Sequence, residues 1–140
     1  MSVKICAIHQ PTFFPWRGYF DKIKRCDVFV FLDDVQFQKN GLQNRNQIKT
    51  PHGKAWLTMP VNYSLGQLIN NVKISSPKMK IKHLRTLHMN YANSQYFSSI
   101  NKMFSTILDQ DDNFISSISI ELIKVILIYL GYQGEIILSS

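Results

Sequence analysis

Residues 3–37 read VKICAIHQPTFFPWRGYFDKIKRCDVFVFLDDVQF, and this stretch decides the fold class. Residues 3–8 are mostly apolar and predict a short strand, which ends before Pro11 because proline has no amide hydrogen for a ladder. Residues 16–25 carry their large apolar side chains at helical spacing. Residues 28–32, VFVFL, are a continuous apolar run, typical of a strand buried on both faces of a parallel sheet. Strand, helix and strand within about thirty residues indicate a βαβ unit.

Beyond residue 36 the pattern changes. Residues 43–50 and 54–61 predict an antiparallel hairpin that turns at Pro51-His52-Gly53, and a short strand is expected at 72–74. Apolar periodicity then predicts helices over 78–90, 95–108 and 113–130, and a last strand over 135–138. We therefore expect one α/β domain over residues 1–140, with a Rossmann-like βαβ start, an inserted hairpin and a helical C-terminal half. We also expect it to be the N-terminal part of a longer domain, truncated before a further α/β unit.

The composition is that of a basic globular protein. The 140 residues are 45% hydrophobic and include 16 lysines and arginines against 9 acids, a net charge of +7. This balance favours phosphate-bearing, polyanionic or membrane-surface partners. Four of the bases fall in one predicted helix, at Lys78, Lys80, Lys82 and Arg85. Their face is either simply solvated or a surface for an anionic partner. The sequence has no motif that recognises nucleobases beside these basic residues, so nucleic-acid binding is not predicted.

Two features bear on the cellular compartment. Cys6 and Cys26 both stand among apolar residues and are expected to be buried free thiols, because nothing in the sequence indicates export. The N-terminal apolar stretch is too short for a signal peptide. The apolar residues 114–130 are interrupted by serines, Glu121 and Lys124, so no membrane span is predicted. We expect a cytoplasmic protein, for which peripheral membrane contact stays open.

Polar pairs follow the two N-terminal strands. His9 and Gln10 come after the first, and Asp33 and Asp34 after the second. In open α/β sheets ligands bind beyond the carboxyl ends of the strands, so adjacent parallel strands would bring both pairs to one crevice. His9 could be a general base, a donor to phosphate or a metal ligand. A carboxylate there could hold a ribose hydroxyl, a metal or an amine. Each pair alone also fits a structural role, such as a turn cap.

A second polar cluster lies in the predicted hairpin. Arg45 offers a guanidinium fork for phosphate or carboxylate, and Asn44 and Asn46 beside it offer directional hydrogen bonds, unless the three only form a polar rim. Trp16 either lines an apolar or sugar-stacking wall or packs in the core. The four histidines make no zinc pattern, and no Gly-rich phosphate loop is present, so no metal site is predicted and the cofactor stays open.

These residues belong to a set of short motifs that together resemble the WbqC-like family. The motifs are Ile8-His9-Gln10-Pro11, Phe14-Pro15-Trp16, Gly18-Tyr19-Phe20-Asp21-Lys22, Asp27-x-Phe29-Val30, Asp33-Asp34-Val35-Gln36-Phe37, Asn44-Arg45-Asn46 and Trp56-Leu57-Thr58-x-Pro60-Val61. The resemblance is dense over residues 5–61 and diffuse beyond them. Members of the family are typically longer than this chain.

The resemblance implies a function in surface polysaccharide or O-antigen biosynthesis, as a transferase of glycine, another aminoacyl or an acyl group to a sugar or polysaccharide precursor. The expected catalytic residues are His9, Asp33 and Asp34. The expected residues for a small-molecule or nucleotide-sugar substrate are Gln10, Trp16, Gln36, Asn44, Arg45 and Asn46. One alternative is a binding subunit for nucleotide sugars without catalysis.

A second alternative is a nucleotide-binding protein similar to the nucleotidyltransferase and pantothenate-synthetase type. That fold type also leads from a first strand through a histidine-containing turn to a helix. However, its paired-histidine motif is replaced here by Arg17-Gly18-Tyr19-Phe20, which speaks against direct adenylyl transfer.

Overall fold

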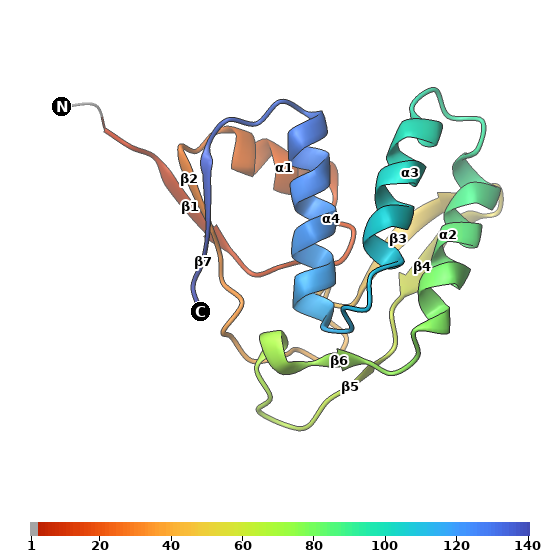
Figure 1. Cartoon of the computed structure of the whole chain (residues 1–140), viewed down its shortest axis with the longest axis horizontal. Coiled ribbons are helices and arrows are strands. Elements are labelled where there is room, and N and C mark those ends of the chain that lie inside the picture. Colours follow the sequence, from red (N-terminus) through yellow and green to blue (C-terminus); the bar gives the residue numbers. More distant parts are fainter. Residues whose placement is uncertain (1–2) are drawn as a thin grey trace.

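The computed structural model describes residues 3–140. Met1 and Ser2, the first two residues of the expected domain, lie outside the described residues. A parallel sheet is formed by β1 (Cys6–His9), β2 (Val28–Phe31) and β7 (Glu135–Leu138), in the order β1-β2-β7. The first two strands are joined through α1 (Arg17–Lys24), as the βαβ pattern predicted. The α/β fold class is therefore confirmed, and the strand from the C-terminal end of the chain pairs beside β2 (Figure 1).

Two helices, α1 and α4 (Ile115–Tyr129), lie on the same side of this sheet (Figure 1). Their contact with the sheet forms one hydrophobic core. It contains Tyr19, Phe20 and Ile23 of α1, Phe29 and Phe31 of β2, and Ile120, Ile123 and Leu127 of α4. Alternate residues of a strand point to opposite faces, which is why Phe29 and Phe31 enter this core together.

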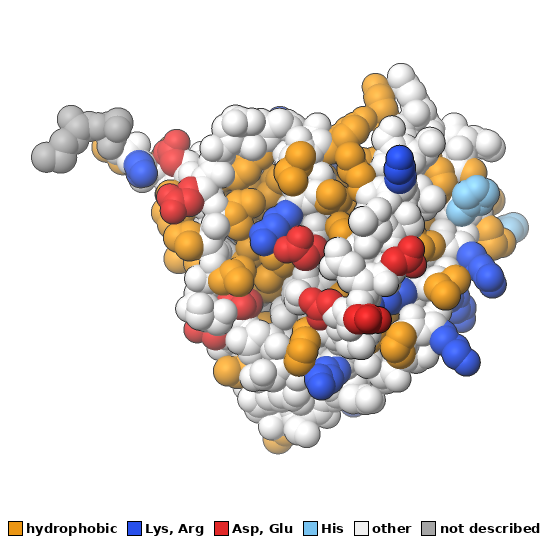
Figure 2. Space-filling view, viewed as in Figure 1, with side chains coloured by type: hydrophobic (Ala, Val, Ile, Leu, Met, Phe, Trp, Pro, Cys, Tyr) orange, Lys and Arg blue, Asp and Glu red, His pale blue; other side chains and the backbone are white. Residues whose placement is uncertain are grey.

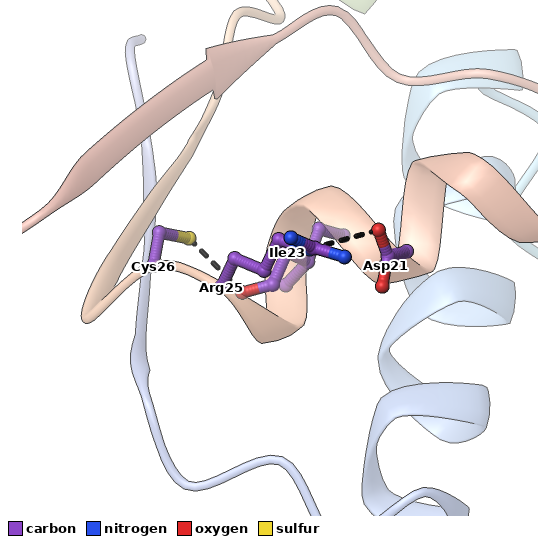
Figure 3. A network of polar contacts seen from close by, with 4 residues as sticks. All are labelled: Asp21, Ile23, Arg25 and Cys26. Carbon is purple, nitrogen blue, oxygen red and sulfur yellow. Dashed lines mark hydrogen bonds and ion pairs between the residues drawn. The ribbon is translucent and has the colours of Figure 1, made fainter.

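The end of α1 is fixed by short-range contacts (Figure 3). Arg25 Nε lies 2.9 Å from Asp21 Oδ2, and the thiol of Cys26 donates to the carbonyl oxygen of Ile23 at 3.0 Å. The ion pair is solvent-exposed, so it contributes little to stability. Cys26 is buried and free, as expected.

The other face of the sheet is open, which corrects two expectations. Cys6 and Ile8 of β1 are exposed, and Val28 and Val30, which pair with them in register, are only partly buried. The run VFVFL is therefore fully buried on one face only, because no helix among residues 3–140 covers the other (Figure 1). Cys6 is free but not buried, since its place in the register puts it on this open face.

The remaining elements form a second core, with α4 shared between the two. The predicted hairpin is confirmed as β3 (Arg45–Thr50) and β4 (Gly53–Thr58), and two of the predicted helices are α2 (Lys78–Tyr91) and α3 (Phe97–Leu108). Their boundaries differ from the predicted ones by at most three residues. Their core includes Phe13, Leu57, Met59, Leu87, Phe104, Ile118 and Leu122. The short β5 (Val61–Asn62) pairs with β6 (Lys73–Ile74), and η1 (Ile69–Asn71) is a 3-10 turn. Within residues 3–140 no helix combines the length and apolarity that a bilayer crossing requires.

Candidate functional site

The carboxyl ends of β1 and β2 meet at one edge of the sheet. His9 pairs in register with Phe31, and the amide of Leu32 donates to the carbonyl oxygen of His9 at 3.0 Å. The two strands are thus adjacent and parallel, so the chain leaves both of them at the same edge. This is the arrangement on which the predicted crevice depends.

His9 is held by two neighbours. Its Nδ1 lies 2.9 Å from the carbonyl oxygen of Gln10, and its ring meets the ring of Tyr19 edge-on at 4.9 Å between centroids. A carbonyl oxygen can only accept, so Nδ1 must carry the hydrogen, and Nε2 is the acceptor of the neutral ring. The Tyr19 hydroxyl donates to the same carbonyl at 3.0 Å, and burial raises the pKa of Tyr19 well above its ordinary value. Tyr19 therefore stays a neutral donor that helps fix this turn.

The side chain of Gln10 is oriented by a residue outside the predicted set. Gln43 Nε2 donates to Gln10 Oε1 at 2.8 Å, and Gln43 Oε1 accepts the amide hydrogen of Gln38 at 2.7 Å. Gln43 is buried, so these bonds tie the end of β1 to the loop after β2. The only sequence signal for Gln43 is its position next to Asn44-Arg45-Asn46.

Two adjoining clefts open beside this turn. The larger has a volume of about 530 Å³, and its lining includes Gln10, Gln36, Lys39 and Tyr63. The smaller, about 240 Å³, shares Phe37, Lys39 and Tyr63 with it and is also lined by Asn40, Asn44 and Arg45. Four of the predicted binding residues, Gln10, Gln36, Asn44 and Arg45, therefore lie along one continuous run of clefts. Lys39 and Tyr63, which link the two clefts, were missed from the sequence because the loops that bring them together have no periodic pattern.

Asn44, Arg45 and Asn46 have three different environments. Asn44 is buried and donates to the carbonyl oxygen of Met59 at 2.9 Å, so it braces the β3–β4 hairpin. Asn46 Nδ2 donates to the carbonyl oxygen of Phe14 at 2.9 Å. Arg45 stacks its guanidinium 4.4 Å from the centroid of the Trp56 ring. Its Nη2 donates to the carbonyl oxygen of Asn40 at 2.7 Å, whereas its Nε is buried with no hydrogen-bond partner among the described residues. The buried Nε cannot reach a ligand, so Arg45 can offer the smaller cleft only its terminal amino groups.

The loop between β1 and α1 is strained. Phe14 has a φ of 45°, in the left-handed region that a bulky residue rarely adopts. Such a conformation costs on the order of 1–3 kcal/mol and persists only where the surroundings enforce it. Here Asn46 holds the carbonyl of Phe14, and the amide of Phe13 donates to the carbonyl of Leu42 at 3.0 Å. The hairpin therefore fixes the loop that follows His9 and Gln10.

Asp33 and Asp34 differ although they are adjacent. Asp33 is only 5% exposed, and its carboxylate accepts from the Ser140 hydroxyl at 2.9 Å and from the Ser140 amide at 3.1 Å. Its backbone amide donates to the Ser139 hydroxyl oxygen at 3.1 Å. Asp34 is exposed and accepts from the Ser139 hydroxyl at 2.6 Å. Asp33 lines a separate cleft of about 230 Å³, together with Asp112 and Lys124 among others. The structure thus joins Gln10, Gln36, Asn44 and Arg45 around one space and puts Asp33 at another. His9, Asp34 and Asn46 are not in the lining of these three clefts.

Trp16 stands outside both clefts. Its side chain is 65% exposed at the start of α1, and its ring covers Gly18 so closely that a Cβ there would fall 2.0 Å from it. An apolar cavity of about 330 Å³ lies elsewhere, between α2 and α3, and no predicted site residue lines it. Within residues 3–140, no three His, Cys, Asp or Glu side chains come together in a way that could hold a metal ion.

Comparison with known proteins places the chain in a family. The model of the WbqC-like protein family matches residues 10–140. An uncharacterized protein of Mycobacterium tuberculosis, Rv1507c, is 36% identical over 137 residues, which cover 96% of this chain and 59% of that relative. The chain thus spans little more than half the length of this relative. No solved structure matches it significantly. The chain belongs to the WbqC-like protein family.

Proposed function

We propose that this chain is a group transferase in surface glycan biosynthesis. It binds a phosphate-bearing sugar or polysaccharide precursor and transfers a glycyl, other aminoacyl or acyl group to it. The observation that carries the proposal is the pair of adjoining clefts, in which Lys39 and Arg45 supply positive charge and Gln10 and Gln36 supply neutral hydrogen-bonding groups. A sugar phosphate needs both kinds of partner, because its phosphate is anionic and its hydroxyls are neutral.

In this proposal Arg45 binds the phosphate. Its guanidinium is fixed by the Asn40 carbonyl and by Trp56, so little side-chain freedom is lost when it binds an anion. Lys39 lines both clefts and would add a second charge. Tyr63 is partly exposed and lies 4.7 Å from Phe37 between ring centroids, which gives the sugar an aromatic wall.

His9 is the proposed general base. With Nδ1 committed to the Gln10 carbonyl, Nε2 takes a proton from the acceptor hydroxyl or amine of the sugar. The freed oxygen or nitrogen then attacks the carbonyl carbon of the activated donor, and the bond to the leaving group breaks. Asp34, the more exposed carboxylate of the pair, would orient the donor amine. We give Asp33 no direct part in this step, since it is buried and its oxygens already accept two hydrogen bonds from Ser140.

The test of the binding step uses Trp56 as a reporter. In a Trp16→Phe background, Trp56 is the remaining tryptophan. Titration with UDP-sugars, GDP-sugars and dTDP-sugars should change its fluorescence, because an anion bound to the guanidinium alters the charge directly beside this ring. Arg45→Gln should weaken binding by roughly 10- to 150-fold, the effect of losing a hydrogen bond to a charged group worth about 1.5–3 kcal/mol. Lys54→Gln, the same loss of charge on the same hairpin but outside both clefts, should bind as the parent does.

The test of catalysis uses His9→Gln. It should retain nucleotide-sugar binding and reduce transfer by roughly 10²- to 10⁴-fold, as expected for loss of a general base. Full transfer by this variant would exclude His9 as the base. Unchanged affinity in Arg45→Gln would exclude the cleft as the anion site.

A binding subunit without catalysis is the second candidate. The hydrogen bonds that occupy Asp33 favour it, because they leave fewer free groups for proton transfer at the strand ends. It is distinguished by nucleotide-sugar affinity that depends on Arg45, with no transferred product from any donor.

A further inference from the structure

The excess of positive over negative charge lies in one part of the chain. Residues 35–108 contain ten of the sixteen lysines and arginines and no aspartate or glutamate, whereas the rest of the chain has six bases and nine acids. The acid-free segment builds β3, β4, α2 and α3. Figure 2 shows lysines, arginines and histidines gathered at the right-hand edge, where Figure 1 places α2, with the acidic side chains over the centre and left.

The outer face of α2 carries cations and apolar side chains together. At about 100° per residue, its exposed members fall within an arc of about 120°. They are Lys78, Ile81, Lys82, Arg85, His88 and Met89. We call this set the α2 outer face. The buried residues of the helix, Lys80, His83 and Leu87, lie on the opposite side.

Among residues 3–140, no side chain pairs with the cations of the α2 outer face. The helix has no acidic residue, and the ion pairs within residues 3–140 are Arg25–Asp21 and Lys124–Glu121, both on other helices. Lys80 is the exception among the helix cations, because it is buried and donates to the carbonyl oxygens of Gln110 and Asp112. The remaining three, Lys78, Lys82 and Arg85, are available to an external anion.

The apolar members of the face decide which anion fits. Ile81 is 52% exposed and Met89 is 83% exposed, two helical turns apart on the same arc as the cations. Nucleic-acid phosphates would use the cations and leave these two side chains in water. A phospholipid surface uses both, because headgroups attract lysine and arginine while apolar side chains enter the boundary with the acyl chains.

We propose that the α2 outer face is a docking surface for membranes that contain anionic phospholipids. Lys78, Lys82 and Arg85 contact the headgroups, and Ile81 and Met89 insert between them. The interaction is peripheral and reversible, since the buried side of α2 stays packed in the core. This surface is separate from the two clefts, because none of its members lines either of them.

The experiment is co-sedimentation of the full chain with vesicles of phosphatidylcholine alone or of equal parts phosphatidylcholine and phosphatidylglycerol. The chain should sediment with the anionic vesicles only. Binding should weaken at high salt, because the Debye length falls from about 10 Å at 0.1 M to about 3 Å at 1 M. Equal binding to both vesicle types would overturn the proposal.

Three variants then separate the contributions. Lys78→Gln/Lys82→Gln/Arg85→Gln should lower the partition coefficient on the order of a hundredfold, from about 1 kcal/mol per charge near an anionic surface. Ile81→Ser/Met89→Ser should also lower it, with the charge intact. The matched control, Lys49→Gln/Lys54→Gln/Lys102→Gln, removes the same charge from exposed positions of the acid-free segment and should retain most of the binding. Equal losses in the two charge triples would mean that net charge alone acts, and would overturn the proposal.

Oligonucleotide binding and nucleotide-sugar affinity are measured on the same variants. Oligonucleotide binding that depends on the cations but not on Ile81 and Met89, without vesicle binding, would assign the face to nucleic acid instead. Nucleotide-sugar affinity should be the same in the α2 triple variant and the parent, so failure of the membrane proposal and failure of the proposed function give different results.

Discussion

At the scale of single residues, the pair Asp33-Asp34 shows how one position decides a role. Asp33 is buried and binds the end of β7 through Ser139 and Ser140, 106 and 107 residues away, whereas Asp34 faces solvent. The first carboxylate therefore joins distant parts of the chain. The second is the one that remains accessible to a ligand.

This difference predicts unequal costs of substitution. Asp33→Ala should lower the free energy of unfolding by about 1–3 kcal/mol, because it leaves the Ser140 amide and the Ser140 hydroxyl without their acceptor. Asp34→Ala should stay within about 0.5 kcal/mol of the parent, as surface substitutions usually do. Urea denaturation followed by circular dichroism measures both. Equal losses in the two variants would contradict a structural role specific to Asp33.

The sequence predicts which residues lie at the strand ends but not which hydrogen-bond partners they have. His9 and Asp33 were expected at one edge because parallel strands end together, and the register of β1 and β2 confirms that expectation. The bonds from Ser139 and Ser140 could not be predicted, because they require β7 to pair beside β2 across more than a hundred residues. Lys39 and Tyr63 were missed for a related reason, since irregular loops bring them together.

At the scale of elements, α2 combines an outward cationic face with buried polar groups that its sequence does not distinguish from surface residues. Lys80 and His83 both point inward. Lys80 binds two backbone carbonyls, and His83 Nδ1 lies 2.5 Å from the carbonyl oxygen of Met79. The basic run at 78–85 is therefore not a uniform solvated face.

His83 should make stability depend on pH. Burial lowers the pKa of His83 in the folded protein, and the charge of Lys82 acts in the same direction, while the bond to the Met79 carbonyl opposes them. The unfolded chain, with a histidine pKa of about 6.5, then binds this proton first. The contribution of His83 is full above about pH 6.5 and is lost as the pH falls below it.

The measurement is the free energy of unfolding from pH 7.5 down to pH 5 in the parent and in His83→Gln. The parent should lose stability on acidification, and the slope should be shallower in the variant. His88→Gln, at the exposed histidine of the same helix, is the matched substitution for comparison. A slope in His83→Gln as steep as in the parent would assign the acid sensitivity to other groups.

Long elements were predicted better than short ones. Helices α2, α3 and α4 span twelve or more residues, enough for apolar periodicity to show in the sequence. In contrast, β5 has two residues and η1 has three, too few for a period of two or of 3.6 residues to repeat. Their positions are fixed by long-range contacts, such as the pairing of Val61 with Ile74.

At the scale of the whole molecule, the elements of residues 3–140 cover the sheet on one face only. The run VFVFL predicted burial on both faces, and this was wrong for one of them. An apolar side chain can be buried, but whether it is buried depends on which elements pack against it. Ile8, Val30 and Ile137 pair in register on the open face, and Ile8 and Ile137 are exposed. Parallel sheets normally have both faces covered, so this face is an exposed apolar patch.

The open face should cause self-association at high concentration. Ile8→Lys should reduce both the apparent mass in light scattering and the binding of the dye ANS, because it puts a charge on the open face, directly beside Val30. Leu65→Lys adds the same charge at an exposed loop position away from the sheet and should leave both unchanged. Identical scattering from the parent and Ile8→Lys at all concentrations would show that the patch is not adhesive.

The acid-free segment has one more consequence, for how the molecule moves before it touches anything. Ten positive charges in residues 35–108 and a net charge of −3 in the rest make the chain an electric dipole. In the field of an anionic object such a dipole turns as it diffuses, so α2 and the β3–β4 hairpin lead the approach. Collisions are then biased toward one orientation, and the open sheet, which belongs to the other part of the chain, trails behind.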